Sequence, residues 1–377
     1  MKLPSLSVPL DLSMFLGSKD LLGVDIGSYS VKITQLKNSK GKWSLSKYAI
    51  VPFPEDIVFQ EINPIEKKAI ISSLIKDCIS KNNITAKNAA ISVSGSSVIV
   101  RYVKFPKISK EDLAKSIQFE AEPYIPFDIK EVNLGFYILG EVTEEGQKKT
   151  DTVLVAAKKD IIQSKMDILY DAGLKPAIVD VDAFALESSY EINKDPEIQE
   201  TVIIVNIGAN VTNITILENG ISRVVRDIFI GGNTFTRTLQ KNLQCDFKKA
   251  EELKQKAGLL VTPEEKEQAL KDDNKEALQC SNIMVSVAKD LLNEIHRSID
   301  FFYSQRGEQQ VINKILLSGG GAKLNNLEKY ISQELKIHTE IFDPLKRIEK
   351  PSNFSLIQTC DFAVSIGLAT RQLKEKQ

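Results

Sequence analysis

A chain of 377 residues is longer than one ordinary domain, so we expect two or more lobes. Its 49 Lys and Arg residues balance 50 Asp and Glu residues, which excludes the broad basic surface that nucleic-acid binding requires. The four cysteines are scattered without paired spacing and there are only two histidines, which argues against a zinc site or a disulfide framework and indicates a reducing cytoplasm.

The N-terminal segment 1–19 lacks the continuous apolar stretch of a signal peptide. No apolar run elsewhere approaches the roughly 20 residues of a membrane-spanning helix. We therefore expect no direct membrane insertion. We interpret segment 1–19 as a flexible leader, with a docking peptide as the alternative.

The next part of the chain predicts the core of a first lobe at 20–96, with strands at 44–52 and 89–94 around a helix at 65–82. Residues 97–176 then read as an inserted small α+β subdomain in the order strand, helix, strand, strand, helix. Ser109 is a plausible N-cap of its first helix, and Gly173 closes its second. The segment 180–193 predicts a helix that returns to the first lobe.

The second half predicts another lobe core at 200–233 and 312–360. A helical, heavily charged subdomain at 234–311 separates these two segments. Residues 177–199 and 361–377 are predicted to complete the first lobe, the latter as a helix with an apolar stripe that packs between the lobes.

An internal repeat organises this arrangement. Residues 22–36 align without a gap on residues 203–217, and Asp25 is matched by the nearly isosteric Asn206. Six aligned pairs are identical: Val24/Val205, Ile26/Ile207, Gly27/Gly208, Ile33/Ile214, Thr34/Thr215 and Leu36/Leu217. The offset of 181 residues is about half the chain, which indicates a duplicated fold.

Each copy reads as a buried strand, a tight turn opened by glycine and a second strand. Glycine lets the backbone approach an anion closely, and the N–H groups of such a turn can converge on phosphate oxygens. Two such turns facing each other across a cleft would clamp the β- and γ-phosphates of a nucleotide.

Four motifs carry a resemblance to a known family: DIGSYSVK (25–32), NIGANVT (206–212), LLSGGGAKL (316–324) and AVSIGLATR (363–371). Together they resemble the superfamily of actin, sugar kinases and DnaK-type chaperones, and within it the PilM family, relatives of the division protein FtsA. The resemblance covers the chain from about residue 20. It implies an α/β, actin-like (ribonuclease H-like) duplicated two-lobe fold, with the inserted subdomain where PilM and FtsA carry theirs.

The resemblance also implies a site for ATP and Mg²⁺, in which Asp25 orders the metal through its water shell. Backbone and side-chain donors for phosphate come from two loops: Gly27, Ser28, Tyr29, Ser30 and Lys32 in the first, and Gly208, Ala209, Asn210 and Thr212 in the second. The adenosine would lie against Gly319, Gly320 and Gly321. Glu251 and Lys254 match a ribose- and adenine-contacting helix, although a solvated helical face explains the same charges.

For catalysis, Asp180 sits where the superfamily has a residue that orients the attacking water. Asp182 is its rival, and a helix N-cap is the alternative for either. One position departs from the superfamily pattern, because Asn206 replaces the usual Asp of the second phosphate loop. The amide removes a negative charge from the magnesium side, so we expect tight ATP·Mg²⁺ binding with slow hydrolysis.

The function implied is that of an ATP-binding cytoplasmic scaffold in type IV pilus assembly, peripherally associated with the inner membrane. It would dock the cytoplasmic N-terminal segment of a PilN-like bitopic membrane protein. Pilus assembly ATPases and a second copy of the chain, in a homodimer, are possible further partners. The stretch 119–128 is a candidate for this docking, with a packed turn as the alternative. An FtsA-like filament protein and a small-molecule kinase are the other functions considered.

Overall fold

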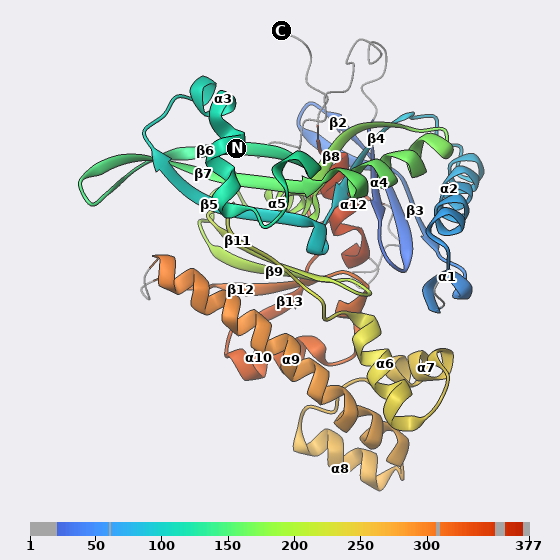
Figure 1. The fold of residues 1–377 in the computed structure, drawn as a ribbon. Coiled ribbons are helices and arrows are strands. Elements are labelled where there is room, and N and C mark those ends of the chain that lie inside the picture. Colours follow the sequence, from blue (N-terminus) through green and yellow to red (C-terminus); the bar gives the residue numbers. More distant parts are fainter. Residues whose placement is uncertain (1–20, 60–61, 307–309, 351–358, 372–377) are drawn as a thin grey trace.

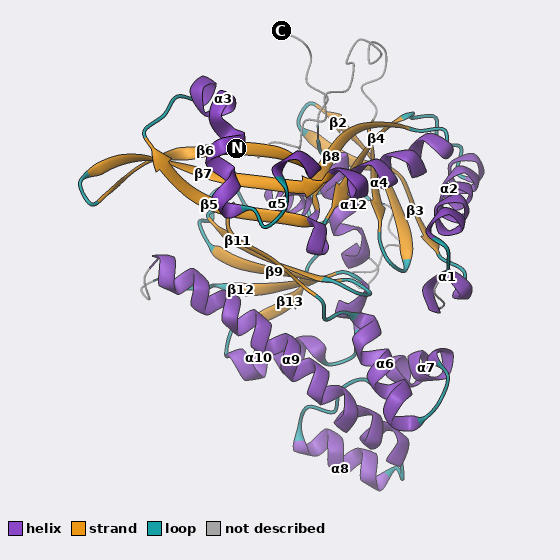
Figure 2. Cartoon of the chain, in the orientation of Figure 1, coloured by secondary structure: helices purple, strands orange, loops and turns teal. Residues whose placement is uncertain are grey.

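The computed structural model describes residues 21–59, 62–306, 310–350 and 359–371. The predicted leader 1–19 and the end of the last predicted helix, 372–377, lie outside this part of the chain. Figure 2 shows that strands form the centre of the molecule and that helices gather around them and below them. The strands are arranged in two five-stranded sheets and one three-stranded sheet.

The first sheet has the order β3-β2-β1-β4-β8. Its first three strands are antiparallel neighbours, whereas β4 and β8 run parallel to β1. The strands are β1 (Leu21–Ile26), β2 (Ser30–Ser39), β3 (Lys42–Pro52), β4 (Asn88–Val93) and β8 (Lys175–Val181).

The second sheet repeats this topology in the order β11-β10-β9-β12-β13. Again three antiparallel neighbours are followed by two parallel strands. The strands are β9 (Thr201–Ile207), β10 (Thr212–Glu218), β11 (Ile221–Ile228), β12 (Lys314–Ser318) and β13 (Thr339–Ile341). The duplication predicted from the repeat is therefore confirmed at the level of whole sheets.

The third sheet, of order β5-β7-β6, is antiparallel and lies beside the two larger ones (Figure 1). Helix α3 covers it with its own apolar cluster, in which Leu113 and Ala121 pack against Val103 and Leu154. Ser109 caps α3 as expected, since its Oγ accepts from the Asp112 N–H at 3.1 Å. The elements are β5 (Val98–Pro106), α3 (Lys110–Ala121), β6 (Val132–Glu144) and β7 (Gln147–Lys158).

Helices α2 (Pro64–Lys81) and α4 (Lys159–Asp171) pack together outside the first sheet, after the short α1 (Glu55–Phe59). Asn63 and Pro64 begin α2, because the Asn63 side chain accepts the Ile65 N–H and proline needs no such partner. Helix α4 contacts β4 and β8 as well as β7, so it joins the inserted segment to the first lobe. The predicted domain boundaries stay a prediction.

A group of helices extends from the second sheet (Figure 1). The 32-residue α9 runs from this group across β10 and β11, and its apolar stripe forms one core with the strands. The members are α6 (Gly232–Leu243), α7 (Phe247–Ala257), α8 (Pro263–Lys271), α9 (Lys275–Arg306) and α10 (Leu327–Leu335).

Helices α5 (Asp182–Asn193) and α12 (Ala363–Ala369) lie between the two large sheets (Figure 1). Helix α12 packs closely on both β1 and α5, because a glycine lies at each of these two contacts. A Cβ added at Gly23 of β1 would lie 1.8 Å from the Ser365 carbonyl oxygen, and one at Gly367 would lie 1.7 Å from that of Ala185. The two helices thus fix the lobes to each other.

The structure differs from the sequence prediction at one element beside the site. Residues 180–193 were predicted as one helix, but Asp180 and Val181 end strand β8, and α5 begins at Asp182. In the described residues, no helix combines the length and the apolar character that crossing a bilayer requires.

Candidate functional site

The first glycine turn joins β1 to β2. It is closed by the Gly27 N–H, which donates to the Ser30 carbonyl oxygen at 3.2 Å. A Cβ at Gly27 would crowd that oxygen at 3.2 Å and Lys32 Nζ at 3.3 Å. Ser28 and Tyr29 are exposed at the tip, whereas Ser30 is buried.

The second glycine turn joins β9 to β10 and is closed by the equivalent bond, from the Gly208 N–H to the Val211 carbonyl oxygen at 2.9 Å. A Cβ at Gly208 would lie only 2.7 Å from that oxygen. Ala209 and Asn210 form the outer part of the turn. Thr212 is fully buried, and its hydroxyl donates to the Ile230 carbonyl oxygen at 2.6 Å. Its side chain therefore supports the turn from behind.

Behind each turn, one residue pair occupies matching register positions in the two lobes. In the first lobe Asp25 pairs with Lys32, with Oδ2 and Nζ 3.3 Å apart. In the second lobe the same positions hold Asn206 and Asn213, joined by a hydrogen bond of 2.8 Å. The duplication thus keeps the backbone and replaces an ion pair with two neutral amides.

Asp25 is poorly hydrated. Burial raises the pKa of its carboxyl group, while the charge of Lys32 opposes that change and Asp182 adds to it. Lys165 of α4 also acts on Asp25, and its ammonium donates to the carbonyl oxygens of Ile26 at 3.3 Å and Ser92 at 2.7 Å. A carboxylate in this environment gains from a further cation, which fits the magnesium role predicted for it.

The start of α6 is packed onto the second turn. The N–H groups of Gly232 and Asn233 donate to the carbonyl oxygens of Gly208 at 2.9 Å and Ala209 at 2.8 Å. A Cβ at Gly231 would lie 2.6 Å from the Ala209 oxygen. The first N–H groups of the helix thereby hold the turn in shape.

Helix α7 places Glu251 and Lys254 beside this helix start. Lys254 Nζ lies 2.6 Å from Glu251 Oε2 and donates to the Gly232 carbonyl oxygen at 3.2 Å and to Thr236 Oγ1 at 2.9 Å. Burial lowers the pKa of Lys254. Burial acts to raise the pKa of Glu251, but Lys254 outweighs it and the pKa is lowered. Lys254 and Glu251 are thus engaged with the start of α6 and do not lie on a free helical face.

The three consecutive glycines follow β12 and approach the second turn closely. Gly319 has a φ of +80°, and a Cβ there would lie 2.5 Å from the Ile207 carbonyl oxygen. One at Gly321 would lie 2.3 Å from Ile207 Cγ2, whereas Gly320 faces Asp361 with more room. Gly321 Cα also lies near Gly232, so the loop, the turn and the start of α6 adjoin.

The two candidate catalytic carboxylates are in different surroundings. Asp180 is fully buried, and its Oδ2 accepts from Arg371 Nε at 2.6 Å while Oδ1 accepts the Val181 N–H at 2.8 Å. Burial raises its pKa and Arg371 opposes this. Asp182, in the first turn of α5, is partly exposed, and its charge raises the pKa of both Asp25 and Asp227. The charge of Asp182 thus acts on one carboxylate of each lobe.

The structure brings together most of the predicted residues of the second lobe, and Asp25 with Lys32 in the first. It also adds three that the sequence analysis missed: Lys165, Asp227 and Gly231. The pair Gly231–Gly232 at the start of a helix was a readable signal. Lys165 carried none, because it reaches Ile26 over 139 residues, and Asp227 carried none, because its partner Gly95 lies 132 residues earlier.

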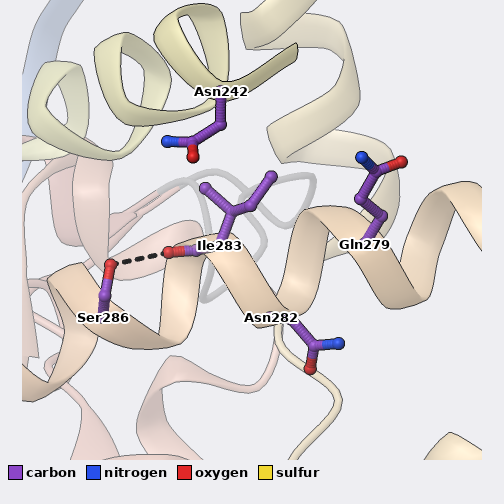
Figure 3. Close-up of a pocket in the computed structure, with 5 residues that line it drawn as sticks. All are labelled: Asn242, Gln279, Asn282, Ile283 and Ser286. Atoms are coloured by element: carbon purple, nitrogen blue, oxygen red, sulfur yellow. Dashed lines mark hydrogen bonds between the residues drawn. The ribbon is translucent and has the colours of Figure 1, made fainter.

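Two hollows lie next to this region on α6. One, of about 440 Å³, is lined by Asn242 of α6 and by side chains of α9. Figure 3 shows Ile283 on the side of α9 that faces Asn242, and Ser286 Oγ donates to the Ile283 carbonyl oxygen at 2.8 Å. The lining side chains of this hollow are neutral and include none of the predicted site residues. The other, of about 770 Å³, reaches Asn210 of the second turn and is lined by Arg237 and Lys241.

Comparison with solved structures extends this description. The chain is similar to one in a solved structure of a "PilM-PilN type IV pilus biogenesis complex", with a sequence identity of 25% and a TM-score of 0.77. The match covers 94% of this chain and 99% of the chain in that structure. The ethanolamine utilization protein EutJ of Carboxydothermus hydrogenoformans is 13% identical, and its match covers 94% of this chain and 90% of EutJ with a TM-score of 0.50. MreB5 of Spiroplasma citri, bound to ADP, is 11% identical, and its match covers 93% of this chain and 95% of MreB5 with a TM-score of 0.51.

The last two similarities show the fold alone, and they confirm the actin-like, duplicated two-lobe class expected from the sequence. A family model described as type IV pilus assembly protein PilM matches residues 23–373. The chain therefore belongs to the PilM family of type IV pilus assembly proteins.

Proposed function

We propose that the chain binds ATP with Mg²⁺ between its two glycine turns and acts as a scaffold in type IV pilus assembly. The proposed nucleotide binding is supported by one observation: the two turns are closed by equivalent hydrogen bonds, from the Gly27 N–H to the Ser30 oxygen in one lobe and from the Gly208 N–H to the Val211 oxygen in the other. No side chain fits at Gly208, and only backbone would face an anion there. MreB5, of the same fold, is described as bound to ADP.

Each part of the nucleotide has residues suited to it. Asp25 would order the metal through water, and Lys32 would neutralise phosphate charge. The triphosphate would contact backbone of both turns. The ribose and adenine would lie near Glu251 and Lys254, against the glycines of the third loop. The role proposed for Glu251, Lys254 and the third loop rests on the placement of Lys254 at Gly232, which adjoins Gly321.

We assign water orientation to Asp182 and a structural role to Asp180. Asp180 is fully buried, and both of its oxygens already accept hydrogen bonds, from Arg371 and Val181, so an attacking water has poor access to it. Asp182 is partly exposed. Asn206 lacks the charge usual at its position, and we expect hydrolysis to be slow.

This assignment predicts opposite effects for two matched variants. Asp182→Asn should reduce the slow ATP turnover at least tenfold while leaving stability nearly unchanged. Asp180→Asn should lower the free energy of unfolding by about 3 kcal/mol, because it removes the charged acceptor of the buried Arg371 Nε. Phosphate release and urea unfolding measure the two quantities. An Asp180→Asn protein of normal stability with no turnover would instead make Asp180 the catalytic residue.

The scaffold role follows from the family and from the matched complex. A structure that resembles this chain over 94% of its length is a complex of PilM with PilN. We propose that this chain likewise docks a short cytoplasmic N-terminal segment of a PilN-like inner-membrane protein, and is held at the cytoplasmic face of that membrane by this partner. Contacts with assembly ATPases and homodimer formation belong to the same proposal.

The docking is tested with a fluorescent peptide of the first residues of the PilN-like protein of the same organism. We expect saturable binding to the full chain, and no binding of the same peptide in scrambled order. The stretch 119–128 enters as a variant: Phe119 is 84% exposed, while Tyr124 packs on Phe105 and Ile125 is buried. Phe119→Ser weakens binding only if that stretch forms the docking site. Equal anisotropy for native and scrambled peptides would contradict the docking proposal.

A further inference from the structure

A chain of hydrogen bonds leads from the second turn to the other lobe. Asn206 Nδ2 donates to Asn213 Oδ1 at 2.8 Å, and Asn213 Nδ2 donates to Asp227 Oδ1 at 2.8 Å. The second oxygen of Asp227, Oδ2, accepts the Gly95 N–H at 2.5 Å. Three neighbouring strands of the second sheet supply the side chains, and the first lobe supplies the last donor.

The direction of this chain is set by its only charged member. A carboxylate can only accept, so Asn213 must turn its NH₂ group toward Asp227 and its oxygen toward Asn206. Asn206 must in turn donate to Asn213. Its own oxygen is left on the other side, where it faces Gly319: a Cβ added at Gly319 would lie 2.8 Å from it. The charge on Asp227 thus determines which atom Asn206 presents to the third loop.

The first lobe provides an internal comparison. The register positions of Asn206 and Asn213 correspond to Asp25 and Lys32, which form an ion pair across the two strands. The neighbour of Lys32 on β3 is Ile50, whereas the neighbour of Asn213 on β11 is Asp227. The acid on the third strand occurs in the lobe that has two amides in place of the ion pair.

We infer that Asp227 is a positioning residue for the nucleotide site: through Asn213 it fixes the amide of Asn206 with its oxygen toward the third loop, and through Gly95 it ties this arrangement to the first lobe. The inference rests on the proposed function for the ligand, ATP·Mg²⁺. The amide oxygen of Asn206 then supplies an acceptor, without charge, where the superfamily has a carboxylate.

The link to Gly95 gives the arrangement a consequence outside the site. Gly95 has a φ of +83° and opens the short turn Gly95–Ser97, which leads directly into β5 of the inserted sheet. A Cβ at Gly95 would lie 4.0 Å from Val211 Cγ2 in the second glycine turn. A ligand that orders Asn206 therefore also orders the entry to the inserted subdomain.

The test without nucleotide is a set of three variants compared by hydrogen exchange at the Gly95 amide and by urea unfolding. Asn206→Asp places an acceptor on each side of Asn213, so two oxygen atoms meet. Asp227→Asn removes the charge that sets the direction, so the amides of Asn213 and Asn206 can turn over together. In the double variant the chain is complete again with its direction reversed. We expect exchange at Gly95 about tenfold faster in Asp227→Asn, and a double variant more stable than the sum of the single changes implies. The control is Asp195→Asn, because Asp195 accepts the Glu197 N–H at 3.1 Å away from this site.

The test with nucleotide is a titration of ATP·Mg²⁺. Asp227→Asn should bind ATP·Mg²⁺ about tenfold more weakly than the unmodified protein, and Asp195→Asn should bind it equally well.

Unchanged affinity and unchanged Gly95 exchange in Asp227→Asn would overturn the inference, as would a double variant with no recovered stability. If the unmodified protein binds no ATP, the proposed function fails, while exchange and stability still decide the role of Asp227. If the single variants do not fold, exchange at Gly95 in the unmodified protein decides it: a rate typical of an open turn would overturn the inference.

Discussion

At the residue scale, burial changes the chemistry of single groups between the lobes. Glu187 of α5 is almost completely buried and accepts the Ser222 N–H of β11 at 3.3 Å. Burial raises its pKa from 4.5 to about 7, although the bonds to Ser222 oppose this. This carboxyl group thus titrates near neutral pH at a contact between the first lobe and the second.

The sign of the resulting pH dependence follows from proton binding. Between pH 4.5 and 7 the unfolded chain has released the Glu187 proton and the folded protein has kept it, so this group makes the unfolding free energy fall as pH rises. Glu187→Gln should therefore resemble the unmodified protein near pH 4.5 and be more stable by about 3 kcal/mol above pH 8. Urea unfolding at both pH values measures the difference. An equal difference at the two pH values would contradict the prediction.

At the element scale, α12 and α5 act as the joint between the two sheets. Thr34 and Ser365 share a buried hydrogen bond of 2.7 Å, and Arg371 after α12 holds Asp180 at the end of β8. The glycines of α12 and β1 allow backbone to touch backbone. Movement of one lobe relative to the other must therefore disturb the packing of this pair of helices.

Gly367→Ala tests this joint. The added methyl group would lie 1.7 Å from the Ala185 carbonyl oxygen, and the backbone of α5 cannot yield locally. We expect a loss of about 3 kcal/mol or a failure to fold. The control is Gly140→Ala, where an added Cβ meets nothing within 4 Å. Chemical unfolding compares the two, and equal stability would show that α12 is loosely packed.

The elements also show where sequence reasoning reaches its limit. The repeat at 22–36 and 203–217 predicted the paired sheets correctly, because each glycine turn lies within one short segment. Strand β8 was missed, because both it and the start of α5 are buried and no turn residue separates Val181 from Asp182. The partner of β8 in the sheet is β4, about 87 residues earlier in register. Such pairing leaves no local pattern.

At the scale of the whole molecule, the candidate site is assembled from distant segments. Lys165 reaches Ile26 over 139 residues, and Gly95 reaches Asp227 over 132. The sequence motifs therefore located the loops, but not the groups that surround them. The proposed role of the molecule depends on one property, which is that the two lobes hold a nucleotide between matched turns.

The measurement that tests this property most directly is a calorimetric titration of the purified full-length chain with ATP in the presence of Mg²⁺. We expect one nucleotide per chain. Gly208→Ala should weaken binding at least tenfold because its methyl group would lie 2.7 Å from the Val211 oxygen that closes the turn, and Gly140→Ala should bind normally. Absence of binding by the unmodified chain, or equal affinity in Gly208→Ala, would contradict the account.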